Sequence, residues 1–170
     1  MTAIRPEQPT DLPAIRRVNE QAFGRPNEAH LVDLLRANGR AAISLVATLG
    51  DEIVGHVMFS PISFDPPWPG VRALGLAPVA VLPTCQGWGI GSGLIRAGLA
   101  ACREAGCELV VVLGDPAFYS RFGFARASGR GLDNEYGVDE PFMMLELTAG
   151  PADGARRLVK YAEEFSVVGD

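Results

Sequence analysis

The sequence lacks any apolar run approaching the roughly 20 residues that a membrane-spanning helix needs. Its first residues, Met1–Pro6, contain no apolar segment of the kind found in signal peptides, so we expect a cytoplasmic protein that does not contact membranes. The net charge of −5 argues against the basic face that nucleic-acid binding requires. Three cysteines, an odd number without zinc-ligand spacing, predict reduced thiols and no metal site.

The chain has 170 residues, of which 48% are hydrophobic and 21% charged. These proportions are ordinary for a globular protein, and the length suffices for one sizeable core. No internal repeat or low-complexity tract divides the chain. We therefore predict a single domain over residues 1–170.

The most informative stretch is Val79–Leu94, which joins a short apolar run to a cluster of glycines. Four glycines fall within seven residues, and an amphipathic helical pattern follows without a break. Glycines at a strand-to-helix junction let backbone N–H groups converge without side chains between them, and the first helical turn adds unpaired donors. The stretch predicts a cradle for a phosphate or pyrophosphate.

The residues before this cradle alternate between helical and extended patterns. Apolar spacing predicts helices from about residue 11 to 22 and from 27 to 38, and Leu49-Gly50-Asp51 predicts a hairpin between strands 42–48 and 53–60. On the second strand His56 shares a face with Val54 and Met58. Prolines exclude regular structure from Phe64–Gly70, where Trp68 is expected to be an exposed aromatic, either a lid or a cover for apolar surface.

The cradle lies in a predicted strand–helix–strand unit. Residues 73–82 predict a strand that Pro78 forces to an edge or into a bulge, and we favour a bulge that separates it from the next strand. A helix from residue 90 to 105 leads to the apolar run Leu109–Leu113, which is typical of a buried parallel strand. A short helix over 117–122, a loop over 129–137, and strands at 124, 142–147 and 158–161 complete the prediction.

Together these features resemble the GNAT superfamily of acyl-CoA-dependent N-acyltransferases. Residues Gln86–Gly91 match its motif (R/Q)-x-x-G-x-(G/A), and Tyr119–Phe124 resembles its Y-x-x-x-G-F motif about 30 residues downstream. The resemblance covers residues 2–147 by element order and the motif-bearing core 73–124 by sequence. It implies an α/β (α+β) fold, with a mixed central sheet, a bulged strand splayed at the cofactor slot and helices on both faces. Residues 138–170 form C-terminal strands and a tail.

The resemblance also implies a function, the transfer of the acetyl group of acetyl-CoA directly to a primary amine of a small molecule or peptide. Tyr119 is then the general acid for the leaving thiolate, a role that suits a phenol with a pKa near 10. The remaining implied site residues bind the cofactor through the motif and the preceding strand: Val79, Ala80, Val81, Gln86, Gly87, Trp88, Gly89, Ile90, Gly91 and Ser92.

One departure from the family concerns the general base. Many members carry a glutamate on the bulged strand, but residues 73–82 contain no acid. The candidates are therefore His56, Glu28, Asp115, Glu146 or water. A histidine on such an apolar strand face is more often a hydrogen-bonded core residue than a base, and Asp115 before Pro116 has the pattern of a helix cap first and of a functional acid second.

Two other functional classes stay open at this point. A non-catalytic CoA-binding or regulatory module would keep the cradle and lose the chemistry. A nucleotide-binding oxidoreductase is disfavoured because G-x-G-x-x-G is not matched and only one clear strand–helix–strand unit is present. The sequence does not decide between a monomer and a homodimer.

Overall fold

A computed structural model describes residues 2–148 and 153–168, which form two compact units. The first unit comprises residues 1–60, 77–101 and 163–170, and the second comprises 61–76 and 102–162. Within the described ranges, no helix has the length and apolar character needed to cross a membrane. Strand β5 (Ala73–Val81) and helix α3 (Ile90–Glu104) have residues in both units.

In the first unit, hydrogen bonds join the strands in the order β1-β2-β3-β5. Strand β1 (Thr2–Pro6) pairs antiparallel with β2 (Ile43–Leu49), which pairs antiparallel with β3 (Glu52–Pro61). The predicted hairpin is confirmed, with Gly50 in the left-handed region at its turn. The register of β2 and β3 shifts between Ala47 and Thr48.

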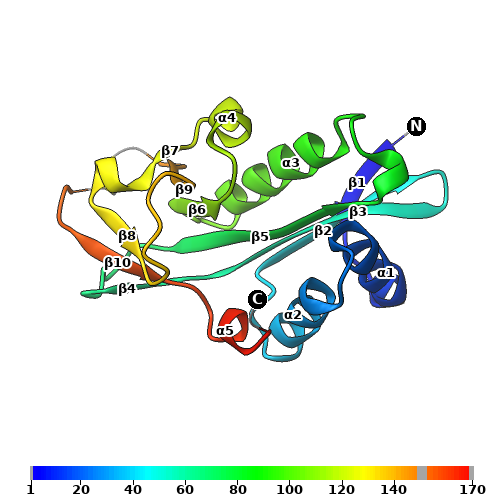
Figure 1. The fold of residues 1–170 in the computed structure, drawn as a ribbon, viewed down its shortest axis with the longest axis horizontal. Coiled ribbons are helices and arrows are strands. Elements are labelled where there is room, and N and C mark those ends of the chain that lie inside the picture. Colours follow the sequence, from blue (N-terminus) through cyan, green and yellow to red (C-terminus); the bar gives the residue numbers. More distant parts are fainter. Residues whose placement is uncertain (1, 149–152, 169–170) are drawn as a thin grey trace. The chain divides into compact units, whose positions relative to one another are not determined.

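Helices cover both faces of β3 in this unit (Figure 1). A side chain at Gly55 would meet Leu94 of α3 at 2.9 Å, whereas the neighbouring His56 contacts Asn19 of α1 (Leu12–Phe23). Successive residues of a strand face opposite sides, so α3 and α1 lie on opposite faces. Helix α3 packs so closely that a Cβ at Gly98 would lie 2.3 Å from the Phe59 ring.

The chain's last described helix joins the first unit through a buried carboxylate. Helix α5 (Glu164–Val168) places Glu164, which is 2% exposed, against the end of α2 (Asn27–Ala37). Glu164 accepts hydrogen bonds from Asn38 at 2.8 Å and Arg40 at 2.6 Å. These bonds lower the pKa of Glu164 despite its burial, which alone would raise it.

In the second unit, the strand order is β5-β6-β9-β7. Strand β6 (Leu109–Leu113) pairs parallel with β5 from Ala73 to Gly75, and antiparallel with β9 (Phe142–Glu146). Strand β9 also pairs with β7 (Ala125–Arg126). The parallel pairing of β5 ends three residues before Pro78, and the bulge predicted at that proline stays a prediction.

A small second sheet in this unit corrects two loop predictions. Strand β10 (Arg157–Lys160) pairs with β4 (Ser63–Asp65) and with β8 (Leu132–Asn134), although we expected loops at both partners. Trp68 is half-buried rather than exposed. It packs edge-on against Phe64, and the Arg157 guanidinium lies 4.0 Å from its ring centroid, an arrangement that suits a covered aromatic rather than a lid.

Candidate functional site

The predicted cradle forms a turn between β5 and α3 in the first unit. A 3-10 turn (Pro83–Cys85) follows the strand, and then Gly87 and Gly89 adopt left-handed φ angles of 84° and 82°. A Cβ at either glycine would have no atom within 4 Å, so the space beside both glycines is open. Glycine is needed here because other residues adopt such φ values at a cost.

Helix α3 starts immediately after this turn, and its first amides have no acceptor within the helix. Its Gly93 amide donates to the Gly89 carbonyl at 3.0 Å, which makes this the first i→i−4 bond of the helix. The amides of Ile90, Gly91 and Ser92 precede that bond and have no partner within the helix. They therefore add to the glycine turn as donors for an anion, at the positive end of the helix dipole.

The Gln86 side chain attaches the turn to β5, whereas the Trp88 side chain points into solvent. Gln86 donates from Nε2 to the Val81 carbonyl at 3.0 Å, so the first residue of the motif ties the turn to the strand. Gly91 also approaches Val81, with 3.8 Å between an added Cβ and Cγ2. Ala80 is buried, Val79 is half-buried, and Trp88 is 65% exposed. The structure thus fits a phosphate-bearing ligand held by main-chain groups.

Tyr119 belongs to the second unit, where it ends the short helix α4 (Pro116–Tyr119). The residue is only 7% exposed and is surrounded by aromatic rings, with its centroid 5.0 Å from Phe118 and 5.8 Å from Phe124. Burial raises the pKa of its phenol above the usual value of 10. The phenol is therefore protonated at neutral pH, as a general acid must be.

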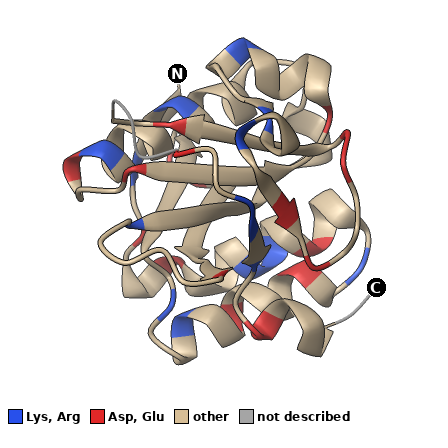
Figure 2. Ribbon diagram, turned by 90° about the vertical axis from the view of Figure 1, so that its left-hand side faces the viewer, with Lys and Arg blue, Asp and Glu red and all other residues tan. Residues whose placement is uncertain are grey.

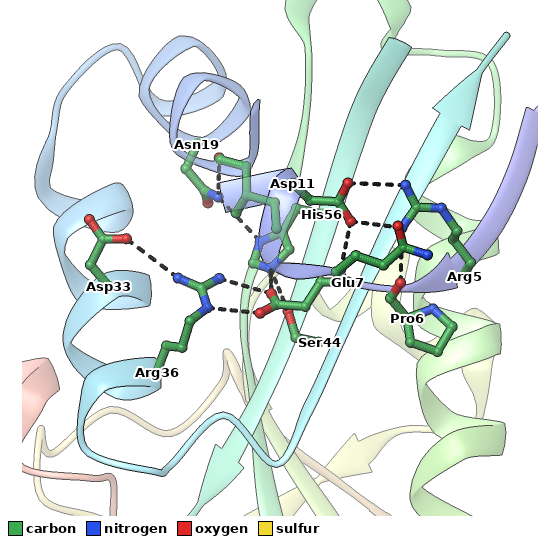
Figure 3. A network of polar contacts seen from close by, with 11 residues as sticks. Arg5, Pro6, Glu7, Asp11, Asn19, Asp33, Arg36, Ser44 and His56 are labelled. Carbon is green, nitrogen blue, oxygen red and sulfur yellow. Dashed lines mark hydrogen bonds and ion pairs between the residues drawn. The ribbon is translucent and has the colours of Figure 1, made fainter. Parts of the chain in front are cut away.

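His56 lies in a hydrogen-bond network in which each ring nitrogen has a partner (Figure 3). The Asn19 side-chain amide donates to Nδ1 at 3.2 Å and also to the Ile15 carbonyl at 3.0 Å. Since an amide nitrogen only donates, Nδ1 is the acceptor and Nε2 carries the proton. Nε2 then donates to Ser44 Oγ at 2.9 Å, and that hydroxyl donates to Glu7.

The network keeps His56 uncharged. The ring is 0% exposed, and burial lowers its pKa to about 4, with Glu7 opposing the shift and Arg36 adding to it. Arg36 donates two hydrogen bonds of 2.8 Å to Glu7. Burial would raise the pKa of Glu7, but the bonds from Arg36 and Ser44 outweigh it and lower the pKa. A histidine without a free lone pair cannot accept a substrate proton, so His56 is a core residue and not the general base.

The three carboxylate candidates for the base also have partners. Glu28 forms an ion pair with Arg25 at 2.6 Å, and Glu146 forms one with Arg130 at 2.7 Å. Asp115 caps α4, accepting a bond from the Ala117 amide at 3.0 Å. The helix-cap alternative stated for Asp115 is confirmed.

Sequence reasoning missed the partners of His56 and the role of Gly114. Glu7, Asn19, Ser44 and Arg36 come from separate elements, and no spacing in the chain connects them to His56. Gly114 precedes α4, and a Cβ there would lie 2.2 Å from Cε2 of Tyr119. Nothing in the local sequence around Gly114 indicates the ring contact, which only the folded structure shows. Within the described residues, no group of three or more His, Cys, Asp or Glu side chains could hold a metal ion.

A mixed α/β fold with a glycine turn at a strand-to-helix junction is typical of proteins that bind phosphate-bearing ligands. Comparison with known proteins then shows which family of such proteins the chain belongs to. The family described as "Acetyltransferase (GNAT) domain" matches residues 3–127. An uncharacterised N-acetyltransferase of Escherichia coli K12, YhbS, is 37% identical over 165 residues, which cover 96% of this chain and 98% of YhbS.

Two solved structures agree with this match. Crystalline E. coli YhbS in complex with CoA superposes with a TM-score of 0.88 at 36% identity, covering 96% of this chain and 91% of that one. A GNAT family acetyltransferase of Brucella melitensis in complex with acetyl-CoA gives a TM-score of 0.82 at 37% identity, covering 98% and 99%. The chain belongs to the GNAT acetyltransferase family and is an N-acyltransferase by that membership, which confirms the predicted family and the mixed α/β fold class.

Proposed function

We propose that the protein transfers the acetyl group of acetyl-CoA to a primary amine of a small molecule or peptide. The observation that carries the proposal is the open glycine turn with free amides at the start of α3. It is supported by two relatives of similar fold whose crystals hold CoA and acetyl-CoA. We treat residues 1–170 as one catalytic domain, of which residues 1, 149–152 and 169–170 lie outside the described part.

We assign binding of the cofactor to main-chain groups of the motif and of the preceding strand. The amides of Gly87, Trp88, Gly89, Ile90, Gly91 and Ser92 hold the pyrophosphate, and Gln86 keeps the turn against β5. The main chain of Val79, Ala80 and Val81 binds the pantetheine arm as an added strand would. Because these contacts involve backbone atoms, they tolerate the absence of basic side chains from the motif.

The reaction follows from the remaining groups. The neutral amine nitrogen attacks the thioester carbonyl carbon, so that a C–N bond forms and the C–S bond breaks. Tyr119 donates its phenolic proton to the departing thiolate sulfur. The attacking nitrogen loses its proton to water, because His56 has no free lone pair and the three carboxylates are engaged within the chain. No covalent enzyme intermediate is required.

The test is a screen for free thiol release from acetyl-CoA over amines, peptides and aminoglycosides, with calorimetry of acetyl-CoA alone. We expect binding, and turnover with at least one amine that yields an acetylated product by mass spectrometry. Tyr119→Phe should lower kcat by about 100-fold and leave acetyl-CoA affinity unchanged. Binding without turnover of any acceptor would favour the non-catalytic CoA-binding module, and an absence of binding would remove the cofactor assignment.

A further inference from the structure

Because Gly114 has no side chain, the Tyr119 ring can occupy the space that a side chain at this position would fill. It connects β6 to α4, and a Cβ built on it would lie 2.2 Å from Cε2, 2.8 Å from Cδ2 and 3.3 Å from Cζ of Tyr119. Carbon atoms that are not bonded pack at about 3.5–4.0 Å. Any side chain at position 114 would therefore displace the ring by roughly 1 Å or more.

The backbone itself does not require glycine at this position. Gly114 is not among the glycines with positive φ, so its φ angle does not itself require glycine. Its amide donates to the Pro141 carbonyl at 3.0 Å, a bond that alanine would keep. The contact with Tyr119 is thus the structural reason for glycine.

The ring has little freedom to move elsewhere. The Phe118, Phe124 and Phe122 rings lie 5.0, 5.8 and 6.3 Å from it, centroid to centroid. The Tyr119 amide donates to the Asp115 carbonyl at 3.0 Å, and the Asp115 carboxylate caps the same turn. The backbone is held at both ends of α4, so a clash at Gly114 must be absorbed by the side chain.

We propose that Gly114 is a positioning residue that sets the location of the Tyr119 hydroxyl for the acetyl transfer. The inference rests on the proposed function, in which Tyr119 is the acid that protonates the thiolate. A displacement of about 1 Å costs on the order of 100-fold in rate when a reacting group is otherwise well placed. Gly114→Ala should therefore lower kcat by roughly 10- to 100-fold and leave acetyl-CoA affinity unchanged.

The experiment uses Gly114→Ala, Tyr119→Phe and their double variant, with Gly129→Ala as the matched control. Gly129 lies in the same unit, its φ is not positive, and an added Cβ would meet nothing within 4 Å. Turnover is measured as thiol release from acetyl-CoA with the acceptor amine that the screen selects. We expect Gly129→Ala to match the wild type, and Gly114→Ala to have no further effect on kcat once the hydroxyl is absent in Tyr119→Phe.

A second readout does not depend on turnover. The chain has three tyrosines, so ring-labelled tyrosine gives a simple NMR spectrum in which Tyr119→Phe identifies the Tyr119 signals. Gly114→Ala should shift those signals and leave Tyr136 and Tyr161 in place. Unshifted Tyr119 signals, or an equal loss of kcat from Gly114→Ala in the Tyr119→Phe background, would overturn the inference.

A folding failure is also informative. If Gly114→Ala unfolds the protein, Gly114→Ala/Tyr119→Ala should restore folding because the clashing ring is gone, and failure of this rescue would count against the contact. The two proposals fail separately. Wild-type kcat in Tyr119→Phe would remove the acid assignment, whereas an inactive Tyr119→Phe beside a fully active Gly114→Ala would remove the role of Gly114 alone.

Discussion

At the scale of single residues, burial of the His56 imidazole makes the stability of the protein depend on pH, because unfolding exposes the ring and restores its ordinary pKa. Its pKa is about 4 in the folded chain, against about 6.5 when exposed. Between these values the unfolded state binds a proton that the folded state does not. The free energy of unfolding must therefore fall as pH falls from about 6.5 towards 4.

The expected loss is about 2 kcal/mol between pH 7 and pH 5 from this group alone. Urea denaturation at pH 7, 6 and 5 measures it, and His56→Gln should flatten the dependence. His30→Gln is the matched control, because the other histidine of the chain is exposed on α2 and lies outside the network. Equal slopes in His56→Gln and the wild type would contradict the assignment.

Residue roles were unevenly predictable from the sequence. The motif glycines could be predicted because a positive φ and an open turn are local properties, and Gly87 and Gly89 have positive φ angles in the structure. Asp115 was readable as a cap for the same reason. The partners of His56 were not, since Glu7, Asn19 and Ser44 converge only after two strands and a helix have packed. The catalytic role of Tyr119 stays a prediction.

At the scale of elements, the junction of β5 with α3 makes the cradle a property of backbone shape. Gly89→Val should disrupt it, because the branched side chain would fill the open turn and disfavour the left-handed φ. Losing one charge-assisted hydrogen bond to the pyrophosphate costs about 1.5–3 kcal/mol, so we expect acetyl-CoA affinity to fall by at least about 10-fold in calorimetry.

The control for this prediction must carry the same backbone strain elsewhere. Gly39 has a φ of 72°, and an added Cβ there would meet nothing within 4 Å. Gly39→Val should therefore share the stability cost of Gly89→Val but bind acetyl-CoA normally. If both variants bind alike, the pyrophosphate site has been misplaced.

Element prediction succeeded where periodicity was strong. The two N-terminal helices, the hairpin and the β5–α3–β6 unit follow from apolar spacing and turn residues, and all are present. Strands β4 and β8 were missed because each has only three residues and pairs with β10, which is distant in sequence from β4 and follows β8 by more than 20 residues. No local sequence pattern predicts such pairing. Helix α5 was missed because its burial depends on Glu164 meeting Arg40, which lies over 120 residues away in sequence.

At the scale of the whole molecule, the net charge of −5 should affect the binding of the two proposed substrates in opposite directions. Figure 2 marks Lys and Arg and also Asp and Glu along the ribbon, and residues of both charges occur in each of the two units. Many of these charges form ion pairs, so the excess of acidic groups acts mainly as a weak long-range field. That field attracts a protonated amine and repels the anionic co-substrate.

Added salt should therefore change kcat/KM differently for the two proposed substrates. Raising NaCl from 0.05 to 0.5 M shortens the Debye length well below about 10 Å. We expect kcat/KM for a cationic acceptor to fall several-fold, whereas kcat/KM for acetyl-CoA should hold or rise. The measurement varies one substrate at a time at saturating levels of the other. A parallel fall for both substrates would show that the acceptor is not recognised through the acidic excess.

The exposed indole of Trp88 stands in the turn between two glycines, with 65% of its surface in solvent. The chain's other tryptophan, Trp68, is half-buried beneath Arg157 in the second unit. One of the two intrinsic fluorophores thus lies in the turn proposed to bind the cofactor, and the other is partly covered by Arg157. The fluorescence of Trp88, isolated in a Trp68→Phe variant, can therefore serve as a label-free signal for titrating the cofactor.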